Sequence, residues 1–159
     1  MGETREVRLR IEAPPEMLWA MVSDLPRMGE WSPENQGGEW LDGATGPAVG
    51  ARFRGRNRRG KSKWPTTVTI EVADPGREFQ FLVGGDKPTA RWRYQFLPDG
   101  AGTEVVESFD LVKALSRMDR IATRATIGVK DREADMEQGM RQTLARLKQA
   151  AEGGDGADG

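Results

Sequence analysis

Two side chains on neighbouring predicted strands are placed to do acid–base chemistry. Glu107 has the same strand parity as Val105 and Phe109, so the alternation turns its carboxyl group toward the apolar face of the sheet. A carboxyl group in an apolar cavity has a raised pKa and can act as a general acid or base. Tyr94, the only tyrosine, shares a face with Trp92, and its phenol can donate a hydrogen bond to a ligand carbonyl or enolate.

Each of these polar residues also has a purely structural interpretation. A bulge in the strand would turn Glu107 away, or an inward arginine from the last helix would pair with it. Tyr94 equally fits a core position in which backbone or water satisfies its hydroxyl group. Asn57 and Thr66 have inward parity on neighbouring strands and can orient the polar end of a ligand, whereas the closeness of Asn57 to a hairpin also suits a plain turn role.

The composition removes most other catalytic chemistry. The 159 residues include no cysteine and no histidine, which excludes disulfides, thiolate metal sites and Ser-His-Asp or Cys-His hydrolases. Four acids alternate along the predicted last helix, at Asp131, Glu133, Asp135 and Glu137. They spread around the helix and do not converge, so we predict no metal site. The glycine-rich stretches close turns and do not join a strand to a helix, so no dinucleotide or phosphate fingerprint is present and we expect no cofactor.

Aromatic residues fall at inward positions of the predicted strands and would form one wall of a cavity. They are Phe53, Trp64, Phe79, Phe81, Trp92, Phe96 and Phe109. Core packing alone favours the same residues in a sheet, so the prediction of a cavity depends on the fold. Met136 and Met140 face the sheet from the last helix, and flexible methionine suits either a plastic pocket or an ordinary core.

The elements that carry these residues follow in a simple order. Alternation over residues 7–11 predicts a first strand, and Pro15 is well placed at the first turn of a short helix over 15–23. A second short helix or turn is predicted at about 25–30. From residue 38 to residue 111, alternating segments separated by Gly, Pro and Asp turns predict about six strands, arranged as an antiparallel meander with one buried face.

A single long helix is available to cover that face. Apolar residues every three or four positions predict it over about 128–151, and the glycine-rich acidic tail 152–159 is expected to be disordered. The stretch 113–127 is predicted as a helix or lid-like connection that uses Leu115, Met118, Ile121 and Ala122. A strongly curved sheet wrapped around the long helix buries both apolar faces and leaves a concave space between them. We therefore predict one α+β domain over residues 1–151.

Four segments carry a resemblance to a known family: residues 13–24 (APPEMLWAMVSD), 31–34 (WSPE), 50–54 (GARFR) and 102–109 (GTEVVESF). Together with the order of elements, over about residues 5–150, they resemble the helix-grip fold of the SRPBCC superfamily, which includes START domains, Bet v 1-like proteins and polyketide cyclases. The bacterial polyketide cyclase/dehydrase branch is the most similar. The resemblance implies about seven strands around a C-terminal helix and a hydrophobic cavity, but it carries over no catalytic residue.

The charge distribution adds a separate surface feature. In a chain of net charge −1, residues 52–63 contain seven cations and no acid: Arg52, Arg54, Arg56, Arg58, Arg59, Lys61 and Lys63. The arginine row can bind phosphate, anionic lipid or RNA, or it forms a solvated outer face that pairs with acids on adjacent strands. The near-neutral total and the scarcity of aromatic residues on that face argue against a nucleic-acid partner.

Three functions remain open from the sequence. The first is binding of an apolar small molecule, such as a lipid, polyketide or aromatic metabolite. The second is a cyclase, aromatase or dehydratase that uses Glu107 as general acid or base while Tyr94 polarises a carbonyl, and the third is an interaction module that uses the strand 52–58. The longest apolar run, residues 17–22, is too short for a signal segment or a membrane span. We therefore expect a cytoplasmic monomer or homodimer without membrane insertion.

Overall fold

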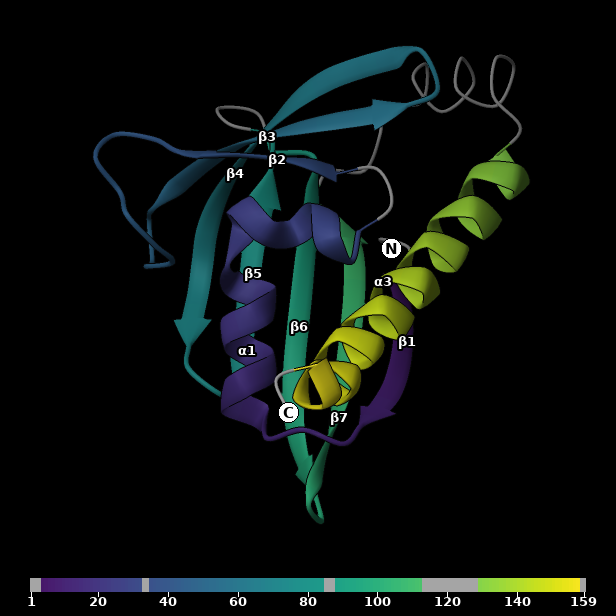
Figure 1. Ribbon diagram of the computed structural model, residues 1–159. Helices are drawn as coiled ribbons and strands as arrows, with labels where there is room; N and C mark the ends of the chain where they lie inside the picture. Colours follow the sequence, from purple (N-terminus) through teal and green to yellow (C-terminus); the bar gives the residue numbers. More distant parts are fainter. Residues whose placement is uncertain (1–3, 33–34, 85–87, 113–128, 158–159) are drawn as a thin grey trace.

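An antiparallel sheet curves around the C-terminal helix in the computed structural model, which describes residues 4–32, 35–84, 88–112 and 129–157 (Figure 1). Its seven strands are β1 (Thr4–Ile11), β2 (Asn35–Trp40), β3 (Arg52–Arg59), β4 (Ser62–Asp74), β5 (Glu78–Val83), β6 (Ala90–Asp99) and β7 (Gly102–Leu111). They lie in the order β1-β7-β6-β5-β4-β3-β2. The predicted helix-grip fold is confirmed.

Short turns join β3 to β4, β4 to β5 and β6 to β7, whereas the longer segment 41–51 connects β2 to β3. The β3–β4 and β6–β7 turns each contain a glycine with positive φ, Gly60 at 61° and Gly100 at 62°, a conformation that L side chains rarely adopt. The first strand joins the far edge of the meander, where Val7 lies opposite Glu107 of β7. This pairing brings the beginning of the chain beside its last strand.

Helices cover the concave face of the sheet. Helix α1 (Pro15–Ser23) and the 3₁₀ helix η1 (Leu25–Glu30) follow β1 as predicted, and the long helix α3 (Val129–Ala157) crosses the sheet (Figure 1). The inner side of α3 is almost fully buried at four positions spaced three or four residues apart: Met140, Leu144, Leu147 and Ala151. This spacing is the helical periodicity from which the element was predicted.

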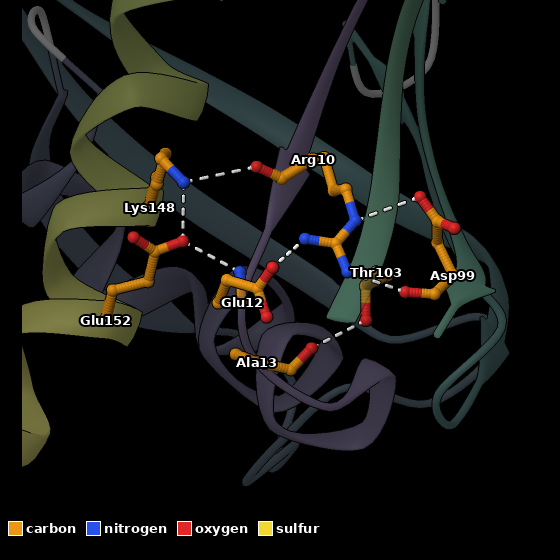
Figure 2. A network of polar contacts seen from close by, with 7 residues as sticks. All are labelled: Arg10, Glu12, Ala13, Asp99, Thr103, Lys148 and Glu152. Carbon is orange, nitrogen blue, oxygen red and sulfur yellow. Dashed lines mark hydrogen bonds and ion pairs between the residues drawn. The ribbon is translucent and has the colours of Figure 1, made fainter. Parts of the chain in front are cut away.

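A network of polar contacts, which we call the polar brace, ties the end of α3 to the rest of the fold (Figure 2). Its members are Arg10, Glu12, Ala13, Asp99, Thr103, Lys148 and Glu152. Lys148 donates a hydrogen bond to the Arg10 carbonyl oxygen at 3.3 Å, and the Arg10 guanidinium in turn contacts Asp99 at 3.0 Å. Thr103 donates to the carbonyl oxygen of Ala13 at 2.7 Å. The brace therefore joins α3, β1 and the β6–β7 turn.

The end of α3 differs from the prediction. The helix continues to Ala157, so residues 152–157 are helical, where we expected a disordered tail from residue 152. The carboxylate of Glu152 accepts hydrogen bonds from the Glu12 backbone N–H at 2.7 Å and from Lys148 at 2.5 Å. The prediction considered only what the tail could bury and missed these polar partners. The segment predicted as a helix or lid over 113–127 lies outside the described residues.

Candidate functional site

A cavity of about 740 Å³ lies between the concave face of the sheet, η1 and the first described half of α3. Ligand pockets of proteins typically measure about 300–1,000 Å³, so the space suits a small organic molecule. Strand residues in its lining include Phe53, Gly55, Val68, Phe81, Val83 and Trp92, and α3 contributes Met136, Gly139, Met140 and Thr143. Apolar groups provide most of the lining surface, and Gln138 and Gln142 of α3 add polar groups to it.

Tyr94 and Glu107 form a polar pair in this wall. They lie directly opposite each other on β6 and β7, with side chains on the concave face, and both line the cavity. The Tyr94 hydroxyl donates a hydrogen bond of 2.9 Å to Glu107 Oε2. The two residues are only 4% and 2% exposed, so the pair is shielded from bulk solvent.

Burial controls the protonation of this pair. It raises the pKa of Glu107 from 4.5 to about 8, against the opposing effect of the Tyr94 hydrogen bond. Burial, followed by the charge of Glu107, also holds the pKa of Tyr94 well above its usual value of 10.0. At neutral pH the carboxyl group is therefore mostly protonated. Among the described residues no group hydrogen bonds to its Oε1, so the hydrogen-bonding capacity of this buried atom is unused.

The structure brings many of the predicted site residues together around the cavity. Besides the Tyr94–Glu107 pair, the lining contains Phe53, Asn57, Thr66, Phe81, Trp92, Met136 and Met140. The Asn57 side-chain amide donates to the Thr66 hydroxyl at 2.7 Å and to the Trp64 carbonyl oxygen at 3.2 Å. Asn57 therefore links β3 to β4 while it lines the cavity.

Four of the aromatic residues expected in the cavity wall lie elsewhere. Phe79 is fully buried beneath α1, where its ring meets the Trp19 ring edge-on with 6.3 Å between the ring centroids. Phe96 is also buried in the core. The Phe109 ring packs against the ring of Trp92, with 4.8 Å between the ring centroids, and of the two only Trp92 lines the cavity. Trp64 is 39% exposed on the β3–β4 hairpin. Parity places residues on the concave face, but it does not tell which part of that face a helix covers.

Other lining residues were not singled out from the sequence. Leu25 and Met28 of η1 enter the cavity, as do Ser32 and Asn35 just beyond it. No pattern in that short irregular segment distinguishes a lining position from a core position. Thr143, in contrast, follows Met140 by three residues and Met136 by seven, so helical spacing was a sufficient signal.

Comparison with known proteins agrees with this architecture. The model of a family described as polyketide cyclase / dehydrase and lipid transport matches residues 4–152. The solution structure of a polyketide-cyclase-like protein, Cgl2372 from Corynebacterium glutamicum, is 31% identical, with a TM-score of 0.69 over 96% of this chain and 93% of the other.

Two more distant structures share the fold. The ZhuI aromatase/cyclase from Streptomyces sp. R1128 is 16% identical, with a TM-score of 0.72 over 96% of this chain and 94% of that one. TTHA0849 from Thermus thermophilus is 18% identical, with a TM-score of 0.71 over 96% and 99% of the two chains. No match was found among curated proteins. Within the described residues, no helix is both long and apolar enough to cross a membrane.

Proposed function

Because the chain belongs to the family of polyketide cyclases, dehydrases and lipid transport proteins, we propose that it binds a hydrophobic small molecule in the cavity between the sheet and α3. The ligand is a lipid, a polyketide or an aromatic metabolite. The observation that carries the proposal is the mostly apolar cavity of about 740 Å³ with one buried polar pair in its wall. Such sites hold the body of a ligand by apolar contact and orient it by a few polar groups.

The polar pair narrows the chemistry of the ligand. A protonated Glu107 can donate a hydrogen bond from Oε1, the oxygen that lacks a partner among the described residues. A buried polar group without a partner costs about 1–3 kcal/mol, so a ligand that supplies an acceptor there gains affinity by removing this cost. We therefore expect a largely apolar molecule with a carbonyl or hydroxyl oxygen positioned near Glu107.

Native mass spectrometry of the purified protein, followed by solvent extraction, tests this proposal. We expect a stoichiometric ligand or, with an empty protein, saturable binding of such compounds. Gly139 lines the cavity, and a Cβ there would meet no atom within 4 Å, so Gly139→Phe should fill the space and abolish binding. Ala145→Phe, on the exposed side of the same helix, is the matched control. Equal binding by both variants would contradict the proposal.

A second candidate function is catalysis on the bound molecule, as a cyclase, aromatase or dehydratase. The observation that favours it is the pKa of Glu107, about 8, which is near the value that suits a general acid or base at neutral pH. In this function Glu107 moves the proton and Tyr94 polarises a ligand carbonyl. Glu107→Gln should abolish turnover while ligand affinity stays within about tenfold. Equal turnover in the variant would exclude the acid–base role.

A further inference from the structure

The end of the β3–β4 hairpin carries cations that the described structure does not neutralise. We call Arg58, Lys61 and Lys63 the basic tip. All three are exposed, and no acidic side chain of the described residues pairs with any of them. Arg58 and Lys63 lie directly opposite each other in the register, an arrangement in which like charges destabilise a strand pair. The fold therefore keeps a local repulsion that an external anion would relieve.

Most of the unbalanced charge lies at this end of the arginine row, and Arg54 is the one further arginine of the row that is exposed without an acidic partner among the described residues. Further along β3, Arg56 contacts Glu39 at 3.1 Å and Arg52 contacts Asp42 at 3.6 Å. Those pairs fit the solvated outer face that the sequence also allowed. The basic tip does not fit that interpretation, because its cations lack acidic partners among the described residues. The β3–β4 hairpin that carries the tip lies at the end of the molecule opposite the β6–β7 turn (Figure 1).

An aromatic residue accompanies the basic tip. Trp64 directly follows Lys63 and is 39% exposed, although its parity matches the apolar face. Tryptophan with neighbouring cations is characteristic of segments that rest in the interface of an anionic bilayer. A single-stranded nucleic acid would instead favour several aromatic residues that stack on successive bases, and Trp64 is the only aromatic residue of the hairpin end that the structure describes.

The cavity reaches the same end of the hairpin. Arg58, Arg59 and Gly60 belong to its lining, so a surface that contacts the tip lies close to the cavity. From these observations we propose that the β3–β4 hairpin docks the protein on membranes containing anionic lipids, with the cavity next to the bilayer. An apolar ligand then exchanges with the bilayer without full exposure to water. This exchange rests on the proposed function, whereas docking itself does not.

Vesicle flotation tests the docking directly, without any knowledge of the ligand. The probes are phosphatidylcholine vesicles with about a third phosphatidylserine and vesicles of phosphatidylcholine alone. We expect binding to the anionic vesicles only, falling steeply between about 0.05 and 0.5 M salt. Arg58→Gln/Lys63→Gln should weaken the binding about 30-fold, since each cation near such a surface contributes a factor of about five.

A matched variant separates the basic tip from net charge. Arg52→Gln/Arg56→Gln removes two cations from the same strand, but each of them already has an acidic partner, so we expect at most a few-fold loss. Trp64→Ser should weaken the binding that remains at high salt. Equal losses in the two double variants, equal binding to neutral vesicles or no binding at low salt would overturn the proposal. Tighter binding to a DNA or RNA oligonucleotide than to anionic vesicles would also overturn it.

Discussion

The two ends of the contact between α3 and the sheet are built differently. At the braced end, Leu144, Leu147 and Ala151 are no more than 1% exposed, and the polar brace fixes the helix to β1 and the β6–β7 turn (Figure 2). At the cavity end, Met136 and Gly139 of the same helix face open space. One helix therefore serves both as an anchor and as the wall of the candidate site.

The two ends also differ in whether their polar side chains have hydrogen-bond partners. In the polar brace, the Glu152 carboxylate has two partners and the Arg10 guanidinium contacts both Glu12 and Asp99. In the cavity, Glu107 is buried with one oxygen that has no partner among the described residues. Buried groups without partners are destabilising, and proteins retain them mostly where they serve a function. The comparison indicates that stability comes mainly from one end and binding from the other.

The largest expected effect lies in the pH dependence of stability. The native Glu107 carboxyl, with a pKa of about 8, keeps its proton at pH values where the unfolded chain, with the usual value of 4.5, has lost it. Its contribution to the free energy of unfolding is therefore complete below about pH 4.5 and is lost as the pH rises to about 8. The full change is up to about 5 kcal/mol.

Replacing the carboxyl isolates this contribution. In urea titrations across that pH range, the free energy of unfolding of wild type should fall relative to that of Glu107→Gln, because the amide does not titrate. Other carboxylates affect both proteins equally and cancel in the difference. A constant difference at all pH values would mean that folding does not raise the pKa of Glu107, and the contrast between the two ends would lose its main support.

A pair of core truncations on α3 compares the two ends directly. Leu147→Ala removes a fully buried side chain from the braced end and should lower the free energy of unfolding by about 3 kcal/mol. Met136→Ala removes a half-buried side chain that borders existing space, so we expect a loss below about 1 kcal/mol. Chemical denaturation of both variants gives the comparison. Similar losses would show that the cavity end is packed as tightly as the core.

Much of the fold and one part of the site could be predicted because they depend on local patterns. Alternation along β7 placed Glu107 on the concave face, and helical spacing placed Met140 beneath the sheet. The pairing of Tyr94 with Glu107 is itself implied by the β6–β7 turn: once Asp99 lies opposite Gly102, antiparallel register brings residues 94 and 107 together. That step needs the turn geometry as well as the parity.

The rest depends on which element covers which part of the sheet. Phe79 and Phe81 have the same parity on β5, but α1 covers the first while the cavity meets the second. Nothing in their local sequence distinguishes them. A register shift between Ile70 and Val72 likewise interrupts the alternation of β4, and no glycine or proline at that position signals it. Tertiary packing decides these positions.

The smallest effect we predict concerns the polar brace itself. Glu152→Ala removes the acceptor for the Glu12 backbone N–H and for Lys148, both at the junction of α3 with β1, and should lower the free energy of unfolding by about 1 kcal/mol. Glu137→Ala is the matched control, because among the described residues Glu137 makes only an exposed pair with Arg141 one turn along the same helix, and its loss should change stability by less than about 0.5 kcal/mol. Chemical denaturation measures both. Equal losses would show that the brace adds nothing beyond an ordinary surface ion pair and that apolar packing around Leu147 alone anchors α3. A larger loss for Glu152→Ala, with unchanged ligand binding, would confirm that the two ends act separately.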